Sequence, residues 1–283
     1  MSEHSYEDIV KPELLYHYTT ADTFRKIIES PQIRFNRLDR MDDPFEAVSE
    51  DLGCKGQLIF VSSWTSSSRE ISKFWWDYAE KGTGVRIELP THPFETNVLS
   101  NTIFQNEPFS SEIPPDLVFD DEVTAVPHEK LILEPVTYTD DPNRKFQKMW
   151  HPGPNGGETL LYSVLWRYKH TKWDYQEEWR YIIPVFPVPF SIRNVDAEVY
   201  LNTIAPYTSK MIRSKNSINK TEVFLKMKSE ALNRMVVRFG PTISDADRKD
   251  LVLFTGRRLP GIKFEASTIE EKDFIKLFEK NVV

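Results

Sequence analysis

The sequence predicts an α+β fold, and three observations favour it. Short runs rich in β-branched and aromatic residues, which are typical of strands, recur along the chain. Segments in which apolar residues follow helical spacing lie scattered between those runs. No internal repeat or low-complexity tract interrupts the pattern. We therefore expect one α+β domain over residues 1–283, with a long irregular insertion at about 92–128 and a C-terminal αβ extension from about 205.

The first third of the chain carries strand and helix signals in close succession. Thr20 or Asp22 can cap a helix with a buried apolar stripe. Ser68 is expected to cap a second helix, which Gly82 and Gly84 stop. The strands expected in this part are 14–19, 33–35, 57–63 and 85–89, and the apolar stripe of the first helix is Phe24, Ile27 and Ile28.

The middle of the chain is less regular. Residues from about 92 to 128 are rich in Pro, Asn, Ser and acids, which favours a long loop over a packed element. A strand is expected over 131–138 and a helix over 159–169. The residues that predict this helix, because they fall on one side of it, are Leu161, Val164, Leu165 and Tyr168.

The C-terminal part returns to clear helix signals. Ser244 is expected to cap a polar helix that ends near Gly256. Thr268 and Glu271 have the spacing of a capping box, which predicts a terminal helix. The strands expected here are 198–201, 224–227, 235–240 and 262–266.

The composition favours a soluble, cytoplasmic globular protein. Hydrophobic residues make up 40% of the 283, which allows a sizeable core. A net charge of −7 argues against a generic nucleic-acid-binding surface. The single Cys54 excludes an internal disulfide framework. Neither a signal-peptide core nor an apolar run long enough to span a bilayer is expected.

Signatures of most common enzyme classes are missing from the sequence. None of the six histidines pairs with another His, a Cys or an acid at metal-ligand spacing, so no metal site is expected. There is no phosphate-binding glycine loop, no dinucleotide fingerprint and no nucleophilic serine elbow. Any catalytic function must therefore rest on other side chains.

Two adjacent acids interrupt an aromatic run at residues 173–182 that otherwise reads as a strand. In a strand, Gln176 and Glu178 share one face, with Arg180 in line beyond them. The Gln176 amide and the Glu178 carboxylate would then point into one cleft. The alternative is an ordinary polar strand face in which Glu178 pairs with a cation. Arg180 either neutralises Glu178 or binds a phosphate of a ligand.

The segment Asp42-Asp-Pro-Phe-Glu46 also has two interpretations. In the first, Asp43 or Glu46 lines the same cleft as Glu178. In the second, the segment is the capped start of a short helix with Phe45 in the core.

Several short motifs, in order along nearly the whole chain, resemble a widespread bacterial family known mainly as a domain of unknown function. Two departures from that family's usual pattern stand out. Asp42 replaces its usual Asn, and Gln176 replaces the first acid of its Glu-X-Glu-Trp-Arg strand. The matching motifs are Tyr16-His-Tyr-Thr-Thr, Asp42-Asp-Pro-Phe-Glu, Phe60-Val-Ser-Ser-Trp, Trp75-Trp-Asp-Tyr-Ala, Gly84-Val-Arg-Ile, Tyr175-Gln-Glu-Glu-Trp-Arg and Phe239-Gly-Pro.

The order of these motifs is also similar to the ADP-ribosyltransferase fold. That resemblance implies a split mixed or antiparallel sheet with flanking helices. His17 matches the position that holds the NAD ribose, and Ser62 matches the one that shapes the nicotinamide pocket. Gln176 and Glu178 match the late Gln-X-Glu strand, with Glu178 as the catalytic carboxylate and Gln176 holding the acceptor.

Two tyrosines complete the site that the resemblance implies. Tyr18 or Tyr78 would stack on nicotinamide, although core packing is the alternative for both. Cleavage of the ribose–nicotinamide bond builds positive charge on the sugar, and a fixed carboxylate would stabilise that charge. Arg180 completes the set as a residue that could contact the ligand.

We therefore expect an NAD-dependent ADP-ribosyltransferase or NAD glycohydrolase, with NAD as substrate and a protein or nucleic acid as acceptor. Such an activity would suit a toxin or a phage-defence effector. One alternative is a non-catalytic nucleotide- or protein-binding domain. Another is a carboxylate-based hydrolase of a different glycosidic bond, which would need a second acid about 5–9 Å from Glu178.

Overall fold

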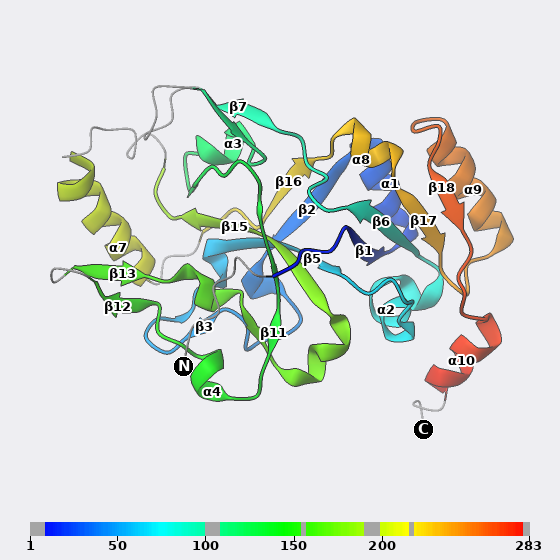
Figure 1. Cartoon of the computed structure of the whole chain (residues 1–283), viewed down its shortest axis with the longest axis horizontal. Helices are drawn as coiled ribbons and strands as arrows, with labels where there is room; N and C mark the ends of the chain where they lie inside the picture. Colours follow the sequence, from blue (N-terminus) through cyan, green and yellow to red (C-terminus); the bar gives the residue numbers. More distant parts are fainter. Residues whose placement is uncertain (1–8, 100–107, 154–156, 190–198, 215–217, 280–283) are drawn as a thin grey trace. The chain divides into compact units, whose positions relative to one another are not determined.

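The computed structural model describes residues 9–99, 108–153, 157–189, 199–214 and 218–279 (Figure 1). It confirms a mixed α+β fold with a mixed sheet and several helices. The chain divides into two compact units. Unit 1 comprises Met1–Pro31, Trp64–Pro93 and Met227–Val283, and unit 2 comprises Gln32–Ser63 and Phe94–Lys226. The single-domain organisation stays a prediction.

Unit 1 is built on strands from both ends of the chain. β1 (Leu14–Thr19) pairs antiparallel with β6 (Val85–Pro90), and β6 pairs antiparallel with β17 (Val236–Phe239). β17 then pairs parallel with β18 (Lys263–Glu265), so the sheet is mixed. The helical elements of this unit are α1 (Ala21–Glu29), α2 (Ser72–Tyr78), the 3-10 turn Glu80–Gly82, α8 (Ser229–Asn233), α9 (Asp245–Gly256) and α10 (Glu271–Glu279).

Of the four expected helix starts in unit 1, two are confirmed and two are wrong. Ser68 does not cap α2, because this helix begins only at Ser72 and its N-cap residue, Ile71, makes no side-chain capping hydrogen bond. The Thr20 hydroxyl caps α1, and the predicted apolar stripe of α1 is buried. Ser244 caps α9 in the same way. The capping box at Thr268 does not form, because both the backbone N–H and the hydroxyl of Thr268 donate to Glu70 Oε1 at 2.7 Å. α10 therefore begins only at Glu271.

Unit 2 is organised around β15 (Glu178–Phe186), which is buried along most of its length. β15 pairs antiparallel with β10 (Ile132–Pro135) and neighbours β5 (Ile59–Thr65), whose residues up to Ser63 belong to this unit. β5 also pairs with β2, which pairs with β16. The remaining bounds in unit 2 are β2 (Gln32–Arg37), β3 (Val48–Ser49), β4 (Gly53–Cys54), β11 (Thr137–Tyr138), α4 (Pro142–Lys145), β12 (Trp150–Pro152), α7 (Ala205–Arg213) and β16 (Glu222–Lys226), with 3-10 turns at Leu38–Arg40 and Gly56–Leu58.

The helix predicted over 159–169 is wrong. This segment forms β13 (Glu158–Leu160), a 3-10 turn (Tyr162–Leu165) and β14 (Tyr168–Lys169). β13 closes a hairpin with β12, and β14 pairs parallel with β11. The neighbouring strands β12 and β11 bond to backbone N–H and C=O groups that a helix would have paired internally. Strand pairing with these distant segments therefore outweighs the helical spacing of the apolar residues.

A second correction concerns the strand expected at 198–201. Tyr200–Ile204 is a π-helical turn that leads into α7, and residue 198 lies outside the described residues. Pro206 in the first turn of α7 suits a helix start rather than a strand.

The region at 92–128 is packed rather than loose. Outside residues 100–107, which are not described, it contains three short strands and one helical turn. Several of its apolar side chains are buried in unit 2, so this region adds to the core. The elements are β7 (Asn97–Leu99), β8 (Phe109–Ser111), α3 (Pro115–Val118) and β9 (Thr124–Ala125), and the buried side chains include Leu99, Ile113, Leu117, Val118 and Val123.

Leu165 is expected to be a stability determinant of unit 2, because only 1% of it is exposed. Leu165→Ala should lower the free energy of unfolding by about 2–5 kcal/mol, through lost burial and the cavity that remains. Leu253→Ala is the matched control, since Leu253 is 61% exposed, and it should change stability by less than about 1 kcal/mol. Urea denaturation measures both. Equal effects would contradict the placement of Leu165 in the core.

Candidate functional site

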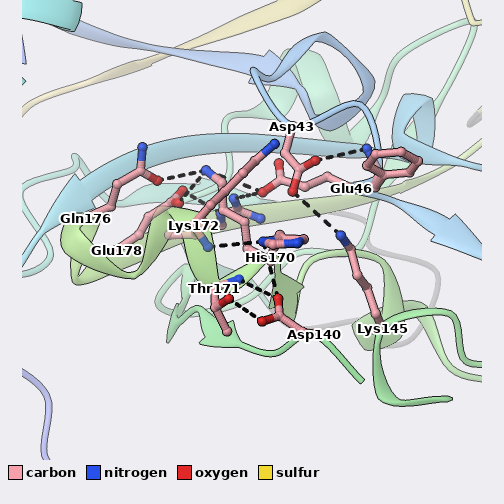
Figure 2. A network of polar contacts seen from close by, with 12 residues as sticks. Asp43, Glu46, Asp140, Lys145, His170, Thr171, Lys172, Gln176 and Glu178 are labelled. Atoms are coloured by element: carbon pink, nitrogen blue, oxygen red, sulfur yellow. Dashed lines mark hydrogen bonds and ion pairs between the residues drawn. The ribbon is translucent and has the colours of Figure 1, made fainter. Parts of the chain in front are cut away.

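Glu46, Gln176 and Glu178 belong to a polar network in unit 2 (Figure 2). A fully buried arginine, Arg180, binds both of these glutamates. Arg180 Nε donates to Glu178 Oε1 at 2.6 Å, and Arg180 Nη2 donates to Glu46 Oε1 at 2.7 Å. Arg180 Nη1 donates to the backbone carbonyl of Trp166 at 3.2 Å. Each of the three guanidinium nitrogens therefore has an acceptor, as a buried charge requires.

Lys169, at the end of β14, links the same carboxylates from another side. Its Nζ donates to Gln176 Oε1 at 2.8 Å and to Glu178 Oε2 at 3.0 Å, and it lies 3.5 Å from Glu46 Oε1. The ammonium also lies 4.9 Å from the centre of the Trp173 ring. Two cations are thus shared between two carboxylates, and all four side chains are buried.

The local backbone explains how Gln176 and Glu178 reach the same ammonium. Gln176 ends the 3-10 helix Thr171–Gln176, and Glu178 is the first residue of β15. Glu177 between them is left-handed, with φ 41° and ψ 48°. This conformation is costly for a residue other than Gly, and such strain is often found at functional sites. The expectation that Gln176 and Glu178 share a strand face is wrong, although Glu178 and Arg180 do share one.

The pKa values of the two buried carboxylates, Glu178 and Glu46, are shifted in opposite directions. Burial favours the neutral form of Glu178, but the charges of Arg180 and Lys169 outweigh it and lower the pKa of Glu178 to about 2. For Glu46, burial dominates over the same two cations, and the negative charge of Glu178 adds to it, so the pKa of Glu46 is raised. Carboxylates whose environments push their pKa values apart are candidates for an acid and base pair.

Tyr138 fixes the start of β15. Its hydroxyl accepts a hydrogen bond from the backbone N–H of Glu178 at 3.0 Å. Burial, with the nearby charge of Glu178, raises the pKa of Tyr138. The tyrosine therefore stays neutral and can hold Glu178 in place without adding charge.

The turn Asp43–Glu46 adds two buried carboxylates, Asp43 and Glu46, to the polar residues of unit 2. Asp43 Oδ1 accepts from the backbone N–H of Phe45 at 3.1 Å, and Asp43 Oδ2 lies 3.8 Å from Lys145 Nζ. Glu46 thus joins the buried cluster that contains Glu178, whereas the cleft of the first interpretation stays a prediction. Phe45 is 55% exposed, so its expected place in the core is wrong.

The predicted site residues fall in both units. Gln176, Glu178 and Arg180 lie together in unit 2, where Ser62 is a buried residue of β5. In unit 1, the His17 ring lies 5.0 Å from that of Trp64. The convergence of His17 with Glu178 stays a prediction.

Both tyrosines that were expected to stack on nicotinamide lie in unit 1 and pack against other rings. The Tyr18 hydroxyl accepts from the backbone N–H of Ile71, and its ring lies 4.8 Å from that of Trp75. The Tyr78 ring lies 5.6 Å from that of Phe74. Core packing is thus favoured for Tyr18, which is buried, whereas Tyr78 is only half-buried.

Sequence reasoning missed Lys169 and Tyr138, and it left the role of Glu46 open. Lys169 was hidden at the end of a predicted helix, and Tyr138 at the end of a predicted strand. Charge balance was the usable signal. If both Glu178 and Glu46 are buried, Arg180 alone cannot neutralise them, so a second cation such as Lys169 is needed.

No group of three or more His, Cys, Asp or Glu in the described part of the chain could hold a metal ion. Nor does any helix among these residues have the length and apolarity to cross a membrane.

The arrangement defines a class of site, namely a buried carboxylate–guanidinium–ammonium network at the start of a central strand. Residues 74–181 match a family described as "Protein of unknown function (DUF2971)". This segment carries Lys169, Gln176, Glu178 and Arg180, whereas Glu46 lies outside it. No curated protein and no solved structure matches the chain.

Removing Arg180 should be strongly destabilising. Arg180→Met leaves Lys169 beside two buried carboxylates, Glu46 and Glu178, so the buried negative charge is no longer balanced. We expect a loss of about 3–5 kcal/mol in unfolding free energy at pH 7. Arg213→Met is the control, because Arg213 forms an exposed pair with Glu158 and should cost less than about 1 kcal/mol. Chemical denaturation compares the two, and similar small losses would show that the network adds little stability.

The lowered pKa of Glu178 predicts acid sensitivity. A carboxyl group with a lowered folded-state pKa stabilises the fold above its ordinary pKa, and this stability is lost as the pH falls. Glu178 should therefore contribute up to about 3 kcal/mol to the free energy of unfolding at neutral pH. This contribution should disappear as the pH falls from roughly 5 to 2.

Glu178→Gln should flatten this part of the curve of stability against pH, because Gln does not titrate. Glu158→Gln removes an exposed carboxylate and should keep the wild-type slope. Denaturant midpoints measured across the range test this, and a wild-type slope in Glu178→Gln would refute it.

Proposed function

We propose that this protein cleaves the ribose–nicotinamide bond of NAD, as an ADP-ribosyltransferase or an NAD glycohydrolase, with Glu178 as the catalytic carboxylate. The observation that carries the proposal is the state of Glu178. Its carboxylate is held ionised and oriented by Arg180 and Lys169. A preorganised negative charge of this kind can stabilise the positive charge that develops on the sugar.

The reaction balances without a metal or a further cofactor. The C1′–N bond breaks, and nicotinamide leaves with the bonding electron pair, which neutralises its ring nitrogen. Glu178 stabilises the positive charge left on the sugar. Water or an acceptor nucleophile then bonds to C1′ and loses a proton, which gives the free or the transferred ADP-ribose.

Gln176 has a different role from the one that the strand motif suggested. Its Oε1 accepts from Lys169, and only 5% of the residue is exposed. In the proposed enzyme Gln176 positions Lys169 and, through it, Glu178. The acceptor, whether a host or phage protein or a nucleic acid, would then be held by other groups.

A non-catalytic binding domain is the second candidate function. It is favoured by the charge balance of the network, since Arg180 and Lys169 face Glu46 and Glu178 and all four are buried. Ion pairs balanced in this way occur in cores as structural features. In this case the protein would recognise a nucleotide or a partner protein without turnover.

Hydrolysis of another glycosidic bond is a third candidate, and Glu46 favours it. Lys169 Nζ lies 3.0 Å from Glu178 Oε2 and 3.5 Å from Glu46 Oε1, so these oxygens are no farther apart than the sum of those distances. Retaining glycosidases hold their two carboxyl groups about 5–5.5 Å apart. The raised pKa of Glu46 would suit the general acid.

The decisive measurement is nicotinamide release from NAD by the purified protein. Glu178→Gln should lower turnover by at least roughly 10²–10³, the scale for losing one preorganised electrostatic group. NAD affinity should fall much less, because the carboxylate acts mainly on charge that develops in the transition state.

Glu177→Gln is the matched control. Glu177 is the exposed neighbour of Glu178, so this variant should keep wild-type turnover. NAD binding without turnover would favour the binding domain. The proposal is falsified if folded wild-type protein, supplied with cell extract as acceptor, neither binds nor cleaves NAD.

A further inference from the structure

Arg86 is a buried cation without an anionic partner in the described part of unit 1. It lies on β6 and is 2% exposed. Its Nη1 donates to the backbone carbonyl of Ser68 at 2.9 Å. Its Nε has no hydrogen-bond acceptor among the described residues, and none of their carboxylates lies within ion-pair distance. This contrasts with Arg180 in unit 2, whose three nitrogens all have acceptors.

The acids that could neutralise Arg86 are already used. Arg238 lies directly opposite Arg86 on β17 and pairs with Glu70 at 3.0 Å and Glu265 at 2.5 Å. Glu70 Oε1 also accepts from the N–H and hydroxyl of Thr268. Its Oε2 accepts from the Trp75 indole and from a serine hydroxyl. With five donors around it, Glu70 has no acceptor capacity left for Arg86.

Two tyrosine rings hold the Arg86 guanidinium in place. It lies 4.6 Å from the centre of the Tyr16 ring and 5.8 Å from that of Tyr18. Cation–π contacts of this kind are weaker than an ion pair, and they leave the positive charge uncompensated. The guanidinium is thus fixed in orientation by uncharged groups, and its charge has no counter-ion among the described residues.

The loop above Arg86 offers further groups that suit an anion. Ser68 and Arg69 are exposed, and Ser66 and Ser67 precede them. Because Ser68 accepts from Arg86, the buried guanidinium lies directly beneath this loop. Among the described residues, Arg69 makes no side-chain hydrogen bond or ion pair. The segment therefore combines serine hydroxyls with two guanidinium groups, one exposed and one buried.

We propose that Arg86 and the loop Ser66–Arg69 form a binding site for a phosphate group of a small ligand. A guanidinium presents paired donors that match phosphate oxygens, and serine hydroxyls can fill the remaining acceptor sites of the phosphate. A phosphate would also supply the negative charge that Arg86 lacks. All of its residues belong to unit 1, and the proposal does not rest on NAD cleavage, because phosphate binding needs no catalytic carboxylate.

Calorimetric titration of the full-length protein with pyrophosphate, at constant ionic strength, tests this site. Wild type should bind, and Arg69→Met should weaken binding by roughly 10- to 100-fold, the effect of losing one charge-assisted contact. Arg86→Lys should weaken it by a similar factor, because an ammonium keeps the charge but not the paired donors. Glu178→Gln should bind as wild type does, which separates this site from the catalytic proposal.

Arg234→Met is the matched control, since Arg234 is an exposed arginine of the same unit without an ion pair among the described residues. It should bind pyrophosphate as wild type does. The exposed Arg69 decides the question if Arg86→Lys fails to fold. The proposal is wrong if wild type does not bind pyrophosphate, or if Arg69→Met and Arg234→Met bind equally well.

Discussion

The central constraint on unit 2 is that the buried guanidinium of Arg180 must find an acceptor for each of its nitrogens. A charge removed from water is tolerated only when its hydrogen bonds are made elsewhere. Three separate parts of the chain meet this need, namely the turn that carries Glu46, the backbone at Trp166 and the start of β15 at Glu178. Distant segments are therefore tied together by one side chain, and Lys169 reinforces the connection.

The two arginines that are buried among the described residues, Arg180 and Arg86, use the same side chain differently. Arg180 is saturated by carboxylates and a carbonyl, so it organises the structure around it. Among the described residues, Arg86 is held by two tyrosine rings, a side-chain hydrogen bond with Tyr18 and the carbonyl of Ser68. The Nε of Arg86 has no hydrogen-bond acceptor among the described residues. An anion could supply both this acceptor and the counter-charge, whereas Arg180 already has both.

Local signals predicted the elements whose stability is local. The helix α1 was found because its cap at Thr20 and its apolar stripe lie within one short segment, and α9 was found from its cap at Ser244. The segment 159–169 failed because its hydrogen-bond partners, β11 and β12, lie elsewhere in the chain. Apolar spacing alone does not distinguish a helix from short strands that find partners.

The candidate site was predictable only in part for the same reason. The sequence predicted that Glu178 and Arg180 lie on one face, because residues two apart in a strand share a face. Lys169 enters through tertiary contacts that no short motif encodes, and the motif that ends at Glu46 left the role of Glu46 open. The left-handed Glu177 was also hidden, since nothing in a Glu-Glu pair indicates a change of backbone direction.

The division of unit 1 among three chain segments has a consequence for biosynthesis. β6 pairs with β1 early in the chain, but its partner on the other edge is β17. During translation that edge of β6 has no native partner until Val236–Phe239 has left the ribosome, and β18 follows later still. An unpaired strand edge is a template for wrong pairing. The nascent protein therefore passes through a long interval, the synthesis of Phe94–Lys226 of unit 2, during which the sheet of unit 1 lacks β17 and β18.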